Sequence, residues 1–219
     1  MCRASAEPRR GRASRTRDDV RVADPTADGK RRYGRSRRDL AEAAIRQFEE
    51  KGFSATTVED VAEAAGYSPR TFFRQFSGKE DVVFFDLPDI LSPLQELLVE
   101  PPASAWEAVS AIVVKNAGDW EAGGTGLAQA RTRLLHEEPA LHRRYLEISA
   151  EWESVITRVF AAERGVDPDR DPYPQVLACA IVGACRVAMR RWLVAPEAGL
   201  GEHTAAGLDV IRSGFGLDR

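Results

Sequence analysis

From Ser36 onward, apolar residues recur every three or four positions, the spacing that places them on one face of an α-helix. The first such segment ends at Gly52, a residue typical of helix C-termini. Its apolar face consists of Leu40, Ala44, Ile45 and Phe48. Later in the chain, further helices are predicted at about 104–121, 126–136, 140–164, 173–194 and 203–214. No window alternates as β-strands do, so the sequence predicts an all-α protein.

A short helix is predicted soon after Gly52. It starts at a capping box, either Thr56 with Glu59 or Thr57 with Asp60, because such pairs satisfy the free N–H groups of a helix start. Its apolar stripe consists of Val58, Val61, Ala62 and Ala65. A glycine at position 66 then ends the helix.

A third helix follows in the segment AGYSPRTFFRQF, residues 65–76, which places aromatic side chains beside arginines. Ser68 suits its N-cap, and Pro69 suits its first helical position. Such a segment is either a core helix with a solvated basic edge or a rigid helix whose charges meet an anion. Two short helices joined by a tight glycine-containing turn form a helix-turn-helix, whose second helix can enter the major groove of DNA.

The faces of this third helix separate by angle. Phe72 and Phe76 are four residues apart and are expected to pack inward, whereas Arg70 and Arg74 share the opposite, exposed face with Thr71 nearby. The aromatic residues would anchor a helix too short to be stable alone, and the arginines would reach guanine edges or phosphates. For Phe73 we expect partial exposure, against a thymine methyl group or the sugar-phosphate edge, although it can also complete the core.

A fourth helix is predicted to open at a second capping box, formed by Ser77 and Glu80, and to continue through Phe85. Lys79 lies near its start, where the lysine charge and the N-terminal amides can both meet a phosphate. Prolines at 88, 93, 101 and 102 punctuate the helical region that follows.

Charge is distributed unevenly along the chain. Residues 1–38 carry thirteen Arg and Lys against five Asp and Glu, a net charge of +8, which leaves −11 for residues 39–219. Residues 1–34 also lack periodicity, so we expect a disordered basic arm there. A basic arm on an acidic body indicates a polyanion bound at one end only, and a merely solvated tail is the alternative.

Several classes of protein are disfavoured. The longest apolar stretch, residues 176–189, is shorter than a membrane span and contains Arg186, and no apolar run follows the N-terminal arginines as in a secretory signal. Three cysteines without a framework of spacings fit a reducing cytoplasm. The histidines at 136, 142 and 203 have no metal-like spacing, and no nucleophile or phosphate-loop motif is present. We therefore expect no membrane association, metal, cofactor or enzymatic activity.

The segment TTVEDVAEAAGYSPRTFFRQFSGKEDVV, residues 56–83, resembles the DNA-binding signature of the TetR family of bacterial regulators. The resemblance implies a helix-turn-helix domain of three to four helices at 35–85 and a helical ligand-binding and dimerisation domain at 86–219. By position, Thr57 and Lys79 resemble the family's phosphate contacts. The predicted DNA-binding residues are Arg35, Arg37, Thr57, Ser68, Pro69, Arg70, Thr71, Phe73, Arg74, Gln75 and Lys79. The family commonly has Tyr where Phe73 stands, and Tyr or His where Gln75 stands.

The same resemblance implies a homodimer formed through the last two helices, 173–194 and 203–214, on a pseudo-palindromic operator. The apolar residues of 176–188 cover more than one face, which fits a helix buried against its own core and a partner. For an effector pocket we nominate Trp106, Trp120, Trp152 and Arg186, because tryptophan offers apolar area with one hydrogen-bond donor. Each tryptophan can equally be ordinary core, and Arg186 can be half of an ion pair.

Three functions follow from these patterns. The first is a dimeric transcriptional regulator, a repressor that leaves its operator when a small molecule binds. The second is a DNA-binding regulator without a ligand, acting constitutively or through a protein partner. The third, a helical enzyme with a basic tail, lacks a convincing nucleophile, base or metal site.

Overall fold

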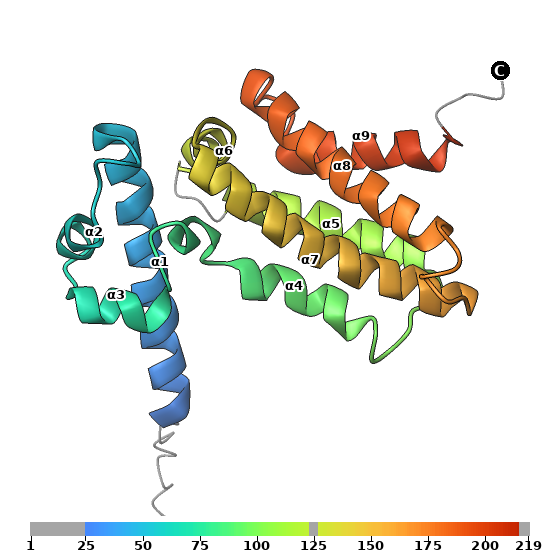
Figure 1. The fold of residues 1–219 in the computed structure, drawn as a ribbon, viewed down its shortest axis with the longest axis horizontal. Helices are drawn as coiled ribbons and strands as arrows, with labels where there is room; N and C mark the ends of the chain where they lie inside the picture. Colours follow the sequence, from blue (N-terminus) through green and yellow to red (C-terminus); the bar gives the residue numbers. More distant parts are fainter. Residues whose placement is uncertain (1–24, 123–126, 215–219) are drawn as a thin grey trace, which may run out of the picture.

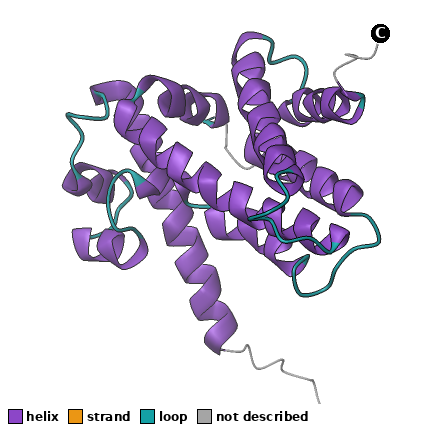
Figure 2. Cartoon of the chain, turned by 45° about the vertical axis from the view of Figure 1, so that its right-hand side comes forward, coloured by secondary structure: helices purple, strands orange, loops and turns teal. Residues whose placement is uncertain are grey.

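A computed structural model describes residues 25–122 and 127–214, and within these ranges it contains helices and loops but no strand (Figures 1 and 2). The all-α prediction is confirmed. Most of the basic arm, residues 1–24, lies outside the described residues. The helices are α1 (Pro25–Lys51), α2 (Val58–Ala64), α3 (Pro69–Gln75), the 3-10 helix η1 (Asp81–Phe84), α4 (Leu87–Glu96), α5 (Ala105–Ala122), α6 (Ala128–Glu137), α7 (Pro139–Arg164), α8 (Tyr173–Val194) and α9 (Leu200–Arg212).

The first helix is longer than the sequence pattern predicts. It begins at Pro25, so residues 25–34, expected to be disordered, are helical. That segment has no apolar face, which is why periodicity did not reveal it. Extending an existing helix is far easier than nucleating one, and Lys and Arg are good helix formers, so the packed part of α1 propagates toward the N-terminus.

The predicted fourth helix is divided. The capping box expected at Ser77 and Glu80 does not form, and residues 81–84 adopt a 3-10 turn instead. The α-helix α4 starts separately at Leu87, with a proline in its first turn. Proline lacks an N–H and suits this place, since the first turn needs no intrahelical donor there. The chain therefore has a short joint, residues 85–86, between η1 and α4.

Helices α1 to η1 form a unit that we call the head, with α2 and α3 lying on one side of the long α1 (Figure 1). Its core contains Phe48, Val61, Phe72 and Val83, each at most 2% exposed. Phe48 also meets Phe53 edge-on, with ring centroids 5.0 Å apart. These side chains supply the apolar burial that helices of only seven residues need in order to be stable.

Helices α4 to α9 form the second unit, which we call the body, with α5 and α7 running side by side and α8 and α9 packed together (Figure 1). Gly207 lets α9 approach α8 closely, because a Cβ atom there would lie 3.1 Å from the Cβ of Ala184. The Glu121 side chain accepts a hydrogen bond from the Leu200 N–H at 2.8 Å, which satisfies the start of α9.

A buried arginine joins the two units. Arg131 on α6 is 3% exposed, and its guanidinium donates to both carboxylate oxygens of Asp86, at 2.6 and 2.8 Å. It also donates to the Val83 carbonyl at 2.5 Å, at the end of the head. The same group lies 3.4 Å from the Trp120 ring centroid and 4.9 Å from that of Phe85. One side chain thus holds the joint between η1 and α4.

Asp86→Ala should lower the free energy of unfolding by about 2–4 kcal/mol, because it leaves a buried guanidinium without its counter-charge. The double variant Asp86→Ala/Arg131→Met should recover part of that loss, since it removes the unpaired charge. Urea unfolding followed by circular dichroism measures both. As a control, Lys115→Ala breaks an ion pair whose side chains are 73% and 61% exposed, and should change stability by about 0.5 kcal/mol or less. Equal losses of unfolding free energy in Asp86→Ala and Lys115→Ala would contradict the conclusion that the Arg131–Asp86 pair stabilises the joint.

Candidate nucleic-acid interface and ligand cavity

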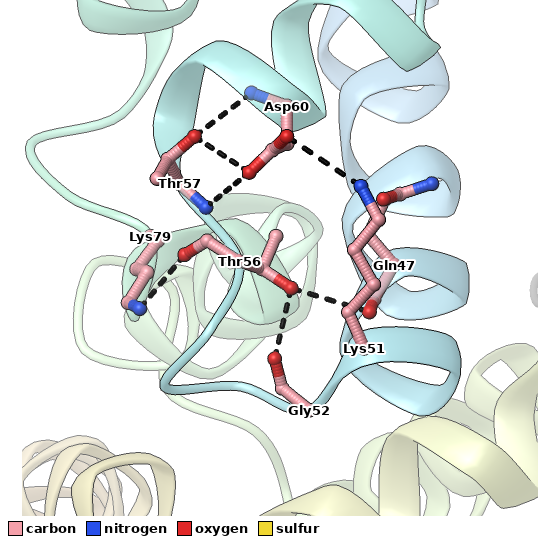
Figure 3. Close-up of polar contacts among 7 residues, drawn as sticks. All are labelled: Gln47, Lys51, Gly52, Thr56, Thr57, Asp60 and Lys79. Carbon is pink, nitrogen blue, oxygen red and sulfur yellow. Dashed lines mark hydrogen bonds and ion pairs between the residues drawn. The ribbon is translucent and has the colours of Figure 1, made fainter.

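The helix-turn-helix begins at the capping box of α2 (Figure 3). The Thr57 hydroxyl accepts from the Asp60 N–H at 3.1 Å, and the Asp60 carboxylate accepts from the Thr57 N–H at 2.8 Å. The Thr57 hydroxyl also donates to the Asp60 carboxylate, and this bond, together with the one from the Thr57 N–H, lowers the pKa of Asp60 from its ordinary value. Of the two capping boxes predicted here, the structure forms Thr57–Asp60. Thr56 is buried instead, and donates to the Gly52 carbonyl at 2.9 Å.

The turn between α2 and α3 depends on Gly66, whose φ of +73° is a left-handed conformation that other residues rarely adopt. Just after it, the Tyr67 hydroxyl donates to Asp39 on α1 at 2.8 Å. That hydrogen bond raises the pKa of Tyr67. The turn is therefore fixed by backbone conformation at one residue and tied to α1 at the next, which sets the angle between α2 and α3.

Helix α3 has the faces that its sequence predicts. The Ser68 hydroxyl accepts from the Thr71 N–H at 3.2 Å and caps the helix. Phe72 is fully buried, whereas Phe73 is 56% exposed. The remaining outward residues of α3 and its cap are exposed or half-buried: Ser68, Pro69, Arg70, Thr71 and Arg74. Arg70, Arg74 and the exposed Phe73 ring thus share the outward side of a short helix.

Two predicted DNA contacts have structural partners instead. Gln75 is 7% exposed, and its amide donates to the Ser36 hydroxyl. Arg37 donates to the carbonyls of Gln75 and Phe85, at 2.5 and 2.7 Å, and lies 4.3 Å from the Phe76 ring centroid. Gln75 is therefore buried between α3 and α1, and the Arg37 fork is occupied in closing the head. Both partners lie far away in sequence, so local spacing did not reveal them.

The two predicted phosphate contacts are also engaged within the head. The Lys79 ammonium donates to the carbonyls of Phe53 and Thr56, at 2.7 and 2.9 Å, and lies 4.4 Å from the Phe53 ring centroid. It closes the loop between α1 and α2 (Figure 3). Thr57 is exposed, but its hydroxyl donates to Asp60 at 2.7 Å. Arg35, in contrast, is exposed at the surface of α1.

A cavity lies in the body next to the joint, where Phe84 of the head also contributes to its wall. Its free space totals about 720 Å³ including the open mouth, of which about 80 Å³ can hold the centre of a water molecule. The lining is mostly apolar and consists of Phe84, Asp86, Leu87, Ile90, Val113, Asn116, Ala117, Trp120, Tyr145, Ile148, Ser149, Trp152, Val182, Cys185, Met189, Leu200 and Thr204. An apolar cavity with a few polar groups is typical of small-molecule sites.

The sequence-nominated pocket residues divide into two pairs. Trp120 and Trp152 line the cavity, whereas Trp106 packs on the second apolar core of the body and Arg186 is absent from the lining. The structure therefore brings two of the four nominated residues to this cavity, Trp120 and Trp152. Sequence reasoning also missed Arg131. The sequence does contain a sign of this residue's role. Arg131 lies between Ala128 and Leu135 on the apolar face of α6, where an arginine needs a buried partner.

The titratable groups that line the cavity are neutral or paired. Burial raises the pKa of Tyr145 to about 12 and that of Cys185 to about 12, so both stay protonated at neutral pH. Asp86 is held by the Arg131 fork. The cavity therefore presents hydrogen-bonding groups without an uncompensated charge.

An apolar stripe runs along the outer face of α8. Val176, Val187 and Val194 are 64%, 44% and 86% exposed. At about 100° per residue, positions 11 and 18 after Val176 return to nearly its own direction, so the three share one face. Val210 on α9 is also 47% exposed. Along the described parts of the chain, no helix is long and apolar enough to cross a membrane, and no group of three potential metal ligands gathers.

Two family models match the chain. Residues 40–84 match "Bacterial regulatory proteins, tetR family", and residues 103–216 match "MftR C-terminal domain". The HTH-type transcriptional regulator TcmR of Streptomyces glaucescens is 34% identical over 192 residues, which cover 83% of this chain and 85% of TcmR. MftR of Mycobacterium tuberculosis is 29% identical over 191 residues, which cover 86% of this chain and 94% of MftR.

Solved structures share the fold. SmeT, the repressor of the Stenotrophomonas maltophilia efflux pump SmeDEF, in complex with triclosan, has a TM-score of 0.61 at 16% identity over 82% of this chain and 91% of SmeT. FadR of Bacillus subtilis, in complex with stearoyl-CoA, has a TM-score of 0.55 at 19% identity over 80% of this chain and 97% of FadR. The head, the matched family models and the relation to TcmR agree, and the chain belongs to the TetR family of DNA-binding transcriptional regulators.

Proposed function

We propose that this regulator is a homodimeric repressor that leaves its operator when a small molecule enters the cavity of the body. The observation that carries the proposal is the position of Arg131. Its guanidinium stacks on Trp120, which lines the cavity, and holds Asp86 and Val83 at the joint to the head. A ligand that displaces Trp120 acts directly on that joint. SmeT and FadR, which share the fold, have been solved with small molecules bound.

The DNA surface consists of the outward residues of α3 together with Arg35. Arg70 and Arg74 are the exposed forks that read guanine edges, because a guanidinium can donate both hydrogen bonds that one guanine accepts in the major groove. Phe73 lies between them with half of its surface free. It contacts a thymine methyl group or a sugar, since the ring has no group that can bind a phosphate.

Arg70→Ala or Arg74→Ala should weaken operator binding by about 1–3 kcal/mol and relax the preference at one base position of each half-site. Arg158→Ala, at an exposed arginine on α7, is the matched control and should leave binding unchanged. Fluorescence anisotropy with operator and scrambled duplexes at fixed salt measures the difference. Equal losses on both duplexes would reduce the two arginines to phosphate contacts.

The homodimer is proposed to form through α8 and α9, whose outer apolar stripe is suited to a second copy. Two heads related by two-fold symmetry would read a pseudo-palindrome with half-sites about one helical turn, or a multiple of it, apart. The same valines would otherwise remain in water, where they give no hydrophobic stabilisation.

Val187→Asp should convert the dimer to a monomer at micromolar concentration, because it places a charge in the centre of the apolar stripe. Val99→Asp is the control, since Val99 is 82% exposed and lies in the loop between α4 and α5. Light scattering coupled to size exclusion gives the mass of each variant. A wild-type protein that is monomeric under these conditions would rule out the proposed interface.

The dimer would exist in a DNA-competent and a DNA-incompetent form. A ligand shifts the equilibrium between these forms only by binding one more tightly than the other. Induction is then a coupling free energy between the cavity and the head. The pivot lies at the short joint before α4, where η1 ends and the body begins. Widening the cavity near Trp120 would change the stacking and the angle of the Arg131 fork. The separation of the two α3 helices in the dimer would change with it.

Arg131→Lys should reduce this coupling while both binding events survive. A lysine keeps the charge but lacks the planar fork that holds both oxygens of Asp86. Thermal shift against a metabolite panel identifies an effector, and operator titrations with and without it give the coupling factor. We expect that factor to fall at least about fivefold, at the low end of typical coupling energies. Arg133→Lys, at an exposed ion pair with Glu49, is the control. A panel without any effector would favour a regulator that acts without a ligand.

A further inference from the structure

We propose that the cavity binds an uncharged, planar aromatic molecule that carries a hydrogen-bond acceptor, and that the indole N–H of Trp152 is the donor that selects it. That such a ligand releases the operator rests on the proposed function; that it binds the cavity does not. Binding itself is measured without DNA, so each can fail independently of the other.

The lining excludes a charged ligand portion. Among the lining residues, the carboxylate of Asp86 already meets a guanidinium, and Tyr145 and Cys185 stay neutral because burial raises their pKa values. A ligand carboxylate or phosphate placed here would lose its water without gaining a cation, which is strongly unfavourable. An anionic group would also lie against Asp86 and compete for the Arg131 fork. The chemistry of the walls therefore favours an uncharged molecule.

The side chains of the cavity wall favour a flat aromatic ring system. Phe84, Trp120, Tyr145 and Trp152 present aromatic rings, and two sulfur-containing side chains, Cys185 and Met189, lie among them. Aromatic pairs and sulfur–aromatic contacts each stabilise a bound ring beyond the area that they bury. With only about 80 Å³ open to the centres of water molecules, a thin molecule enters with less displacement of the walls than a branched one.

The acceptor is required by Trp152. Its Nε1 is buried and has no hydrogen-bond partner, whereas the Nε1 of Trp120 donates to the Thr132 hydroxyl at 3.1 Å. A buried donor without an acceptor is unfavourable, and a ligand acceptor placed there removes that penalty. Tyr145 lies seven residues earlier on α7, which is the same face of the helix, and its hydroxyl donates only to the weak acceptor Met189 Sδ at 3.7 Å. Seven residues rise about 10 Å along a helix, so the Tyr145 hydroxyl is a second, separate donor on the same wall of the cavity.

Four probes separate the components of the proposal. Naphthalene and quinoline have the same flat frame, and quinoline adds one acceptor nitrogen. The 2-naphthoate ion adds a negative charge to that frame, and 1-decanol keeps an acceptor without a ring. Binding to the full-length protein without DNA is measured by ligand-detected NMR competition. We expect quinoline to bind at least as tightly as naphthalene, and 2-naphthoate and 1-decanol at least about tenfold more weakly than quinoline.

The decisive variant is Trp152→Phe, which keeps an aromatic ring and removes the N–H. It should weaken quinoline by about tenfold while changing naphthalene by about twofold or less. Trp192→Phe is the matched control, because Trp192 also has a buried Nε1 without a partner but does not line the cavity. It should leave the ratio of the two affinities as in the wild type, and thermal unfolding verifies that both variants fold.

Three results would overturn the inference. These are an unchanged ratio in Trp152→Phe, tighter binding of 2-naphthoate or 1-decanol than of quinoline, or no binding of either two-ring probe at its solubility limit. Operator titration with quinoline is a separate measurement. If quinoline binds through Trp152 but leaves operator affinity unchanged, the proposed release mechanism fails and the ligand class stands.

Discussion

One buried guanidinium lies where head and body meet and makes the most directional contacts between them. Arg131 satisfies five polar or aromatic contacts at once, since it meets both oxygens of Asp86, the Val83 carbonyl and the rings of Trp120 and Phe85. A buried ion pair adds little net stability, because desolvation offsets most of the attraction, but its directional forks permit few alternative geometries. Its main effect here is to specify how head and body are oriented.

Two further arginines of the body contact the head, but less strongly. Arg133 meets Glu49 on α1 at 3.0 Å, and Arg144 meets Asp81 in η1 at 2.9 Å. The Arg133 side chain is 50% exposed and that of Arg144 is 34% exposed, so water and salt weaken both pairs. The orientation of the head is thus set at Arg131 and supported around it. In a DNA-binding regulator, such an arrangement would let one local change alter the position of α3.

Sequence reasoning succeeded where interactions are local. Helix positions, the Thr57 cap and the opposite directions of Phe72 and Phe73 follow from periodicity and capping rules within a few residues. It did not reveal the intramolecular partners of polar groups when those partners are distant in the chain. The Gln75 amide meets Ser36, and the Lys79 ammonium meets carbonyls more than twenty residues earlier. Position within a family motif identifies the equivalent residues, but only the fold shows which of their hydrogen-bond donors already have an acceptor within the protein.

Packing gives the cavity its influence over the head. The buried apolar cluster that contains Phe72 of the recognition helix continues through η1 into α6, α7 and α8, and Trp120 and Trp152 pack against it. Protein interiors are close-packed, so an added ring displaces its neighbours instead of filling slack space. The Nε1 of Trp152 is buried without a hydrogen-bond partner, and the acceptor of the proposed ligand would satisfy it. Under the proposed mechanism, a ligand in this cavity would act on the head through the core that the two units share.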